Sequence, residues 1–170
     1  EAELSLRKAI DLNPNYSTAY LNLGSLFKNI CNLHQAELYT RKAIELNPNL
    51  AEAHSNLGII LEVLGKSEQA EKVFHKAIEL QPKSPYYYMN LGNLLFDLGR
   101  LKDAEKAIKK AIELKPDLIK AHIKLGEILF DQDKPKEANK SEWNAIKLNP
   151  LFGFLNDYRD KARVINKTAF

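Results

Sequence analysis

The stretch AEAHSNLGIILEVLGKSEQAEKVFHKAIELQPKS, residues 51–84, returns in altered form along most of the chain at a fixed interval of 34 residues. Five of the seven prolines are spaced by this interval, at Pro14, Pro48, Pro82, Pro116 and Pro150. The same spacing relates four of the seven glycines, Gly24, Gly58, Gly92 and Gly126. A repeat of this length indicates one supersecondary unit that is stacked several times.

Each unit carries two runs of apolar residues at helical spacing. In residues 51–84 the first run includes Leu57 and Ile60, and the second includes Ala70 and Phe74. Two amphipathic helices per unit, A and then B, are therefore expected. Neither helix can bury its apolar face alone, so the units must stack on one another. We predict an all-α fold, an α-solenoid of antiparallel helix pairs, and the family resemblance described below implies that this is a right-handed α-solenoid.

The period divides the chain into a leading half repeat, four complete repeats and a closing helix. The expected boundaries are 1–16 for the half repeat (a helix B only), 17–50, 51–84, 85–118 and 119–152 for the four repeats, and 153–170 for the closing helix. The last segment keeps an apolar stripe at helical spacing, and a solenoid needs a cap at its end. The leading helix B without its helix A suggests a fragment of a longer protein.

Small residues at two positions of each repeat mark where helices A and B are expected to cross closely. Positions are counted from the first residue of each repeat, Ser17, Ala51, Pro85 and Ile119. Glycine stands at position 8 and alanine at position 20, as in Gly58 and Ala70. A larger side chain at either place is expected to overpack the contact.

The start of each helix A is predicted from residues that favour the N-cap. Their side chains can accept a hydrogen bond from the first turn of the helix. The expected caps are Asn15, Asn49, Ser84 and Asp117. Pro85, which follows Ser84, suits a first helical position.

The turn between helices A and B is predicted at position 15, which holds Gly65 and Gly99 in the middle repeats. Glycine ends a helix easily because it adopts positive φ. Cys31 and Asp133 occupy the same place in the outer repeats. The Gly-Lys-Ser triplet that begins at Gly65 has the form of a phosphate-binding loop, but Ile60 stands where that loop needs a second glycine. We therefore interpret it as a turn.

At this level of detail the repeats resemble the tetratricopeptide repeat family, whose pattern is Trp-x2-Leu-Gly-x2-Tyr, then Ala-x3-Phe, then Ala and Pro. The resemblance covers residues 1 to about 152. The Phe place departs from the pattern in the first and fourth repeats, which hold Thr40 and Glu142. Tyr39 and Trp143, one residue to either side, are expected to fill the gap.

The resemblance implies a superhelix whose concave wall is formed by the A helices. Position 6, which faces that groove in the family, holds Asn22, Asn56, Asn90 and then Lys124. An Asn side chain both donates and accepts hydrogen bonds, as a peptide backbone requires. The row resembles the asparagine ladder of the O-linked N-acetylglucosamine transferase superhelix, which implies binding of an extended polypeptide. The alternative is that asparagine is a common polar filler at this position.

A basic pair is a second candidate for the groove. Lys120 and Lys124 lie one helical turn apart and can form an anion site. Together with Asn90 they match three of the five places of the clamp with which some family members bind a C-terminal carboxylate. Ser55 and Ile59 do not match the other two. Lys124 can instead pair with Glu127, one turn further on.

Apolar residues form a third candidate group. Tyr86 and Met89 are expected to face the groove, where Met adapts its shape to varied partners. Phe96 and Phe130 are expected to tuck between neighbouring repeats as packing. The charges of the B helices, such as Glu71, are expected on a solvated convex face.

Composition and motif content exclude several function classes. A net charge of +3 is too small to indicate nucleic-acid binding, and no apolar run approaches the ~18 residues of a membrane span. The single Cys31 excludes an internal disulfide and favours a reducing, cytoplasmic location. His54 and His122 occupy the large-aromatic core position, and no spacing of His, Cys or carboxylates indicates a metal site or a nucleophile. We expect no enzyme activity and no cofactor.

The favoured function is protein–protein interaction, with the groove binding an extended or helical segment of a partner. The alternative is that the chain is a spacer or substrate-docking arm of a larger enzyme, such as a glycosyl- or sulfotransferase. Self-association through the open N-terminal helix B is a further expectation, because a head-to-tail contact gives open assemblies.

Overall fold

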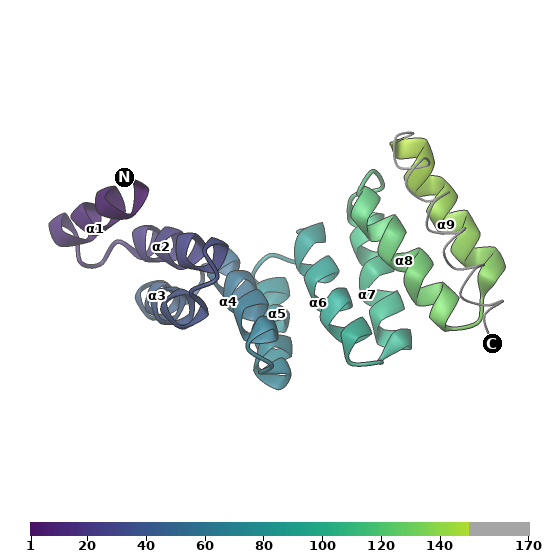
Figure 1. The fold of residues 1–170 in the computed structure, drawn as a ribbon, viewed down its shortest axis with the longest axis horizontal. Helices are drawn as coiled ribbons and strands as arrows, with labels where there is room; N and C mark the ends of the chain where they lie inside the picture. Colours follow the sequence, from purple (N-terminus) through teal and green to yellow (C-terminus); the bar gives the residue numbers. More distant parts are fainter. Residues whose placement is uncertain (150–170) are drawn as a thin grey trace.

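The computed structural model describes residues 1–149, and all regular secondary structure in that part of the chain is α-helical (Figure 1). The helices are α1 (Ala2–Leu12), α2 (Ser17–Asn29), α3 (Leu33–Leu46), α4 (Ala51–Val63), α5 (Ser67–Leu80), α6 (Pro85–Asp97), α7 (Leu101–Leu114), α8 (Ile119–Asp131) and α9 (Pro135–Leu148). The predicted closing helix at 153–170 lies outside the described residues. The even-numbered helices are the A helices, and the odd-numbered helices are the B helices.

The helix pairs stack in a row from α1 to α9, which confirms the predicted right-handed α-solenoid (Figure 1). Each A helix packs most extensively on the B helix that follows it, and each B helix contacts the A helix of the next repeat. Successive A helices, α2 with α4, α4 with α6 and α6 with α8, approach within 8 Å between Cα atoms. Among the described residues the backbones of successive B helices do not. The A helices therefore form the inner wall of the curve.

The glycines at position 8 lie where helices A and B cross, as predicted. A Cβ added at Gly58 would collide with the ring of Phe74, which is fully buried. A Cβ at Gly92 would lie 2.6 Å from Cδ1 of Ile108. At Gly126 the nearest atom is Cγ of Glu142, at 2.8 Å, which belongs to a flexible and partly exposed side chain. A Cβ at Gly24 would meet Oγ1 of the buried Thr40, so the crossing is tight in the first three repeats and more tolerant in the fourth.

Alanine at Gly58 should destabilise the protein by about 1–3 kcal/mol, because the buried Phe74 ring cannot move aside. Gly126→Ala is the matched control, since Glu142 can rotate away and alanine favours the helix by about 0.5–1 kcal/mol. Urea unfolding followed by circular dichroism measures both changes. Equal losses of stability in the two variants would contradict the proposed role of the crossing.

The turns between helices A and B adopt the predicted left-handed backbone. Gly65 and Gly99 both have φ of 72°. Cys31 and Asp133, at the same position in the outer repeats, have φ of 59° and 58°. The turn geometry is thus kept even where a side chain makes it less favourable, because it directs helix B back along helix A.

The predicted N-caps are wrong for three of the four A helices. These helices begin one residue later than expected, so that the caps are Tyr16, Leu50 and Leu118 rather than Asn15, Asn49 and Asp117. Ser84 does cap α6, but without a side-chain hydrogen bond. In the loops before α2 and α4 an asparagine side chain folds the backbone into a turn. Oδ1 of Asn13 accepts a hydrogen bond from the amide of Asn15, and Oδ1 of Asn47 accepts one from the amide of Asn49, both at 3.2 Å. This turn sets the conformation of the loop, and α2 and α4 begin without a hydrogen bond from an N-cap side chain.

His54 and His122 link each A helix to the loop before it. Their Nε2 atoms lie 2.8 Å from the carbonyl oxygens of Pro48 and Pro116, respectively. Both side chains are buried, as expected for the large-aromatic core position. Each hydrogen bond satisfies a loop carbonyl that the proline leaves without a helical partner, so the prediction of a structural role is confirmed.

The two departures at the Phe place are accommodated differently. Thr40 is fully buried against Gly24, and the neighbouring Tyr39 ring stacks on Phe27 with 5.4 Å between ring centroids. Tyr39 thus fills the gap as predicted. Trp143 remains 57% exposed, so the expectation that it would do the same in the fourth repeat is wrong.

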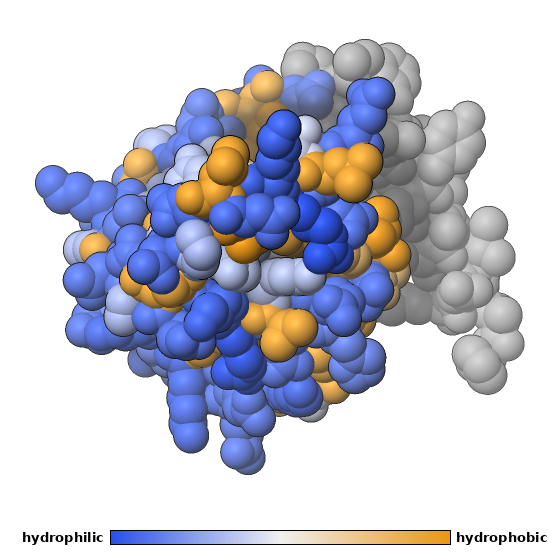
Figure 2. Space-filling model, turned by 90° about the vertical axis from the view of Figure 1, so that its left-hand side faces the viewer, coloured by the Kyte–Doolittle hydropathy of each residue, from blue (hydrophilic) through white to orange (hydrophobic). Residues whose placement is uncertain are grey.

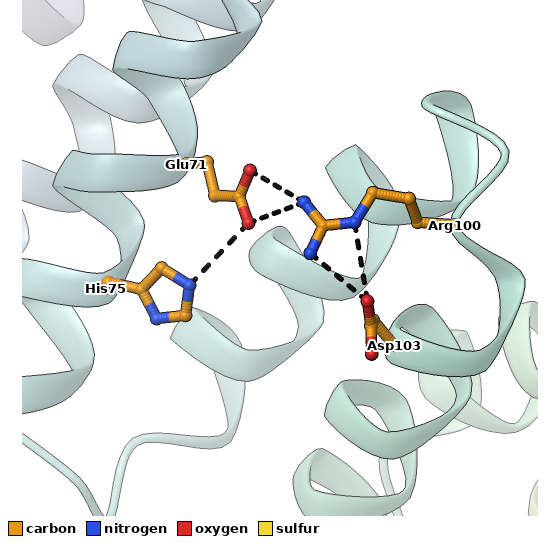
Figure 3. Close-up of polar contacts among 4 residues, drawn as sticks. All are labelled: Glu71, His75, Arg100 and Asp103. Carbon is orange, nitrogen blue, oxygen red and sulfur yellow. Dashed lines mark hydrogen bonds and ion pairs between the residues drawn. The ribbon is translucent and has the colours of Figure 1, made fainter.

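A ladder of ion pairs joins successive repeats on the outer face. An acid at position 21 of one repeat meets a base at position 16 of the next, in the pairs Glu37–Lys66 (2.8 Å), Glu71–Arg100 (2.8 Å) and Glu105–Lys134 (3.4 Å). Figure 3 shows the middle pair, in which Arg100 also contacts Asp103 and the ring of His75 lies beside Glu71. Placing Glu71 on a merely solvated face was therefore wrong, since it is only 24% exposed.

The ion pairs shift the pKa of two of these carboxyls. A hydrogen bond from Lys109 is the largest effect on Glu105 and lowers the pKa below its usual range, against the opposing effect of burial. For Glu37 burial acts upward, but hydrogen bonds from Lys66 and Arg41 outweigh it and the pKa is again lowered. A carboxyl whose pKa falls on folding stabilises the fold above its unfolded pKa of about 4.3, and this contribution is lost as the pH falls through the folded value.

Glu105→Gln should therefore lower the free energy of unfolding by about 0.5–1 kcal/mol at pH 7, and the difference from wild type should vanish near pH 3. Glu79→Gln is the control, because Glu79 is 69% exposed and, among residues 1–149, pairs only with Lys76 of its own helix. Urea titrations of the three proteins between pH 7 and pH 3 make the comparison. A Glu105→Gln effect that persists undiminished at pH 3 would show that packing, rather than charge, is responsible.

Candidate functional site

The predicted asparagine row lies on three successive inner helices, α2, α4 and α6. Asn22 is exposed and makes no side-chain hydrogen bond within the described residues. Asn56 donates from Nδ2 to Oγ of Ser25 at 3.0 Å, and Asn90 donates to Oγ of Ser55 at 3.1 Å. Each of these bonds crosses from one A helix to the preceding one. The row therefore also ties the inner wall together.

These bonds leave part of each amide available for other partners. An Asn side chain has two N–H donors and a carbonyl acceptor, and one donor is used at Asn56 and at Asn90. One N–H and the carbonyl oxygen remain at each, and both side chains are partly exposed. The pattern at position 6 does not predict the serine partners, because they stand at positions 9 and 5 of the neighbouring repeats.

Of the two lysines of the predicted anion site, one is engaged by a neighbouring acid. The Nζ atom of Lys124 lies 2.7 Å from Glu127 and 4.5 Å from the ring centroid of Phe96. Lys120 is exposed and has no ion pair within the described residues. The pairing of Lys124 with Glu127, which the sequence left open, is the arrangement observed.

The apolar candidates differ in exposure. Tyr86 is 48% exposed, and its hydroxyl accepts a hydrogen bond from Lys115 at 3.1 Å. Met89 and Phe96 are partly buried and pack against the central core, so Met89 offers less surface than expected. Phe130 is 42% exposed, although it was expected to pack between repeats. Tyr86 is thus the best-presented aromatic side chain of the predicted set.

An acidic feature of the inner helices was missed in the sequence. Burial raises the pKa of the Glu62 carboxyl above its usual range, and the charge of Asp97 raises it further. Glu62 is partly buried and, unlike Glu37, Glu71 and Glu105, has no ion-pair partner among the described residues. A raised carboxyl pKa means that the ionised form destabilises the fold at neutral pH. In the sequence this feature is visible only as two acids at neighbouring repeat positions, Glu62 at position 12 of the second repeat and Asp97 at position 13 of the third.

Two kinds of site are absent from the described part of the chain. No three or more His, Cys, Asp and Glu side chains in residues 1–149 are grouped so that they could hold a metal ion. Within the same residues, no helix has the length and apolar character needed to cross a membrane.

Family models of the tetratricopeptide repeat match residues 17–50, 39–72, 56–119 and 89–140, which together extend from the first repeat into the fourth. The chain belongs to the tetratricopeptide repeat family. A search of curated protein sequences finds no match.

Solved structures of tetratricopeptide repeat proteins share this fold. A crystal structure of MamA superposes with a TM-score of 0.79 at 24% identity, covering 89% of this chain and 88% of MamA. MamA from Desulfovibrio magneticus RS-1, from residue 41 to its end, gives 0.78 at 22%, with 87% and 84% covered. YrrB, a tetratricopeptide repeat protein with an unusual peptide-binding site, gives 0.73 at 25%, with 85% and 75% covered. Fold and family together support a protein-interaction module.

Proposed function

We propose that the chain binds an extended or helical segment of a partner protein in the concave groove formed by α2, α4, α6 and α8. The observation that carries the proposal is the row of Asn22, Asn56 and Asn90 on consecutive inner helices, each with unused hydrogen-bonding capacity. YrrB, which shares the fold, has a peptide-binding site.

The groove offers chemistry suited to a peptide. An extended backbone alternates N–H and C=O groups, and an Asn side chain can bond either. Tyr86 presents an exposed ring for an apolar side chain. Glu62 and Asp97, which have no cation partner among the described residues, favour a Lys or Arg side chain. Such a ligand would relieve the destabilisation caused by the ionised Glu62. The preferred partner segment is therefore neutral to basic.

Peptides selected from a displayed random library on the wild-type chain test the proposal. The Asn22/Asn56/Asn90→Ala variant should bind them at least about tenfold more weakly, since each net hydrogen bond contributes about 0.5–1.5 kcal/mol. The control is Glu45/Glu79/Glu113→Ala, which truncates three exposed side chains at one repeated position on the outer helices. Fluorescence anisotropy gives the Kd values.

A second variant separates binding from stability of the wall. Ser25/Ser55→Ala removes the partners of Asn56 and Asn90 but keeps the asparagines. This variant should retain peptide binding if the amides contact the ligand. Equal losses in the serine and asparagine variants would assign the row to structure alone. If no selected peptide depends on the groove, the spacer or docking-arm function becomes the better interpretation.

The N-terminal end offers a second surface, for contact with another copy of the chain. In α1 the side chains of Ala2 and Ala9 are exposed or partly exposed, whereas their counterparts Ala36 and Ala43 are fully buried. Leu12 is 79% exposed. Figure 2 shows apolar side chains set among hydrophilic ones over this end of the molecule.

Leu12→Glu should abolish any self-association through α1, because it places a charge in the contact. Sedimentation velocity over a range of concentrations should show the wild-type mass rising without a fixed endpoint, as an open head-to-tail contact requires. Leu38→Glu on α3, where Leu38 is also exposed, serves as the control. A mass that stays that of a monomer at every concentration would exclude this role.

A further inference from the structure

A hollow of about 350 Å³ lies on the outer face, between α5 and α7. Its floor is apolar and consists of Tyr88, Leu91, Leu95 and Ala107. The volume is at the lower end of the range of ~300–1,000 Å³ found for ligand pockets. A hollow of this size accommodates one large side chain rather than a whole peptide. It is on the opposite side of the repeats from the concave groove.

The hollow arises from small side chains at this seam between repeats. Ala107 stands where the preceding repeat has the larger Val73. His75, in the second repeat, stands where the first repeat has Arg41, whose guanidinium donates across the earlier seam to Gln69 at 3.2 Å. The shorter imidazole of His75 turns to Glu71 of its own helix instead, at 3.8 Å. The middle seam is therefore less filled than its neighbour.

The acids at the rim of the hollow already have partners. Arg100 binds Glu71 through Nη1 at 2.8 Å and Asp103 through Nη2 at 3.1 Å (Figure 3). These contacts hold both carboxylates and the guanidinium of Arg100 in one cluster. A ligand at the rim thus meets little free negative charge.

The wall formed by α7 is positive. Lys106 is exposed and has no ion-pair partner within the described residues. Lys110 lies one turn away and donates to the exposed Glu113 at 2.7 Å, a surface pair that another carboxylate can replace at little energetic cost. A hydrogen bond to Glu113 and, to a smaller degree, the nearby hydroxyl of Tyr88 raise the pKa of Lys110. Two ammonium groups and a phenol hydroxyl therefore stand beside an apolar floor.

We propose that this hollow binds an acidic segment of a partner protein. One large aromatic or aliphatic side chain lies on the floor against Tyr88 and Leu91, and a flanking carboxylate is held by Lys106 and Lys110. The charge of the α7 wall selects the sign of the segment, and the size of the hollow limits it to a single anchor side chain. The site is independent of the peptide groove and prefers the opposite charge.

Three capped tripeptides test the recognition on the intact chain: N-acetyl-Glu-Phe-Glu-amide, its Gln-Phe-Gln analogue and its Lys-Phe-Lys analogue. Titration into the ¹⁵N-labelled protein should shift the amide signals of α5, α6 and α7 for the acidic peptide. Its Kd should be about tenfold lower than that of the neutral analogue, the contribution of one charge-assisted contact. Equal binding of the three peptides, or no binding of the acidic one in the millimolar range, would overturn the proposal.

Ala107→Val fills the floor with the residue that the preceding repeat has at the same position, so the fold should tolerate it. We expect this variant, and separately Lys106→Ala, to weaken binding of the acidic peptide about tenfold. Lys72→Ala, the equivalent lysine of α5, is the matched control and should leave the Kd unchanged. Thermal melts show that each variant folds. Undiminished binding by a folded Ala107→Val variant would exclude the hollow as the site.

Discussion

The close crossing of helices A and B within each repeat is the constraint on which the rest of the structure depends. In the second repeat it requires a glycine on helix A, because a Cβ at Gly58 would collide with the Phe74 ring that fills the contact. The crossing sets how helices A and B pack on each other. The residue with positive φ at the turn, Gly65 or Cys31, directs helix B back along helix A. Since every repeat uses the same crossing, the A helices converge on one side and the B helices diverge on the other. Inner wall and outer seams are both consequences of that single contact.

The sequence predicted the parts of the fold that depend on one repeat alone. The period of 34 residues, the helix pairs, the small residues at the crossing and the positive φ at position 15 follow from local spacing and backbone sterics. The core histidines were also predictable, because His54 and His122 occupy a position that must be buried. The N-cap prediction was wrong because two local turns compete in these loops, one at Asn13 or Asn47 and one at the helix start. Which of the two forms depends on how the loop packs.

The features that join one repeat to the next could not be predicted in the same way. The serine partners of Asn56 and Asn90 stand at different positions of their repeats, so no single spacing finds them. Whether Lys124 pairs with Lys120 in an anion site or with Glu127 depends on side-chain directions in α8. The outer ion pairs had a signal, an acid and a base 29 residues apart in Glu37–Lys66 and again in Glu71–Arg100, but it becomes meaningful only when the solenoid places those positions side by side.

The two faces of the solenoid differ in how they can recognise a partner. On the inner face, amide groups fixed by helix-to-helix bonds offer donors and acceptors that suit any backbone. In the proposed groove, selectivity would come from a few side chains such as Tyr86 and Glu62, which has no ion-pair partner within residues 1–149. On the outer face the ladder ties up one acid at each seam, and recognition there combines an incompletely filled seam, as at Ala107, with lysines beside it such as Lys106. Because each repeat contacts only its neighbours, a substitution that fills one outer seam should leave the inner amides of the other repeats in place. The two faces can therefore diverge independently, each by changes at a few positions of the repeat.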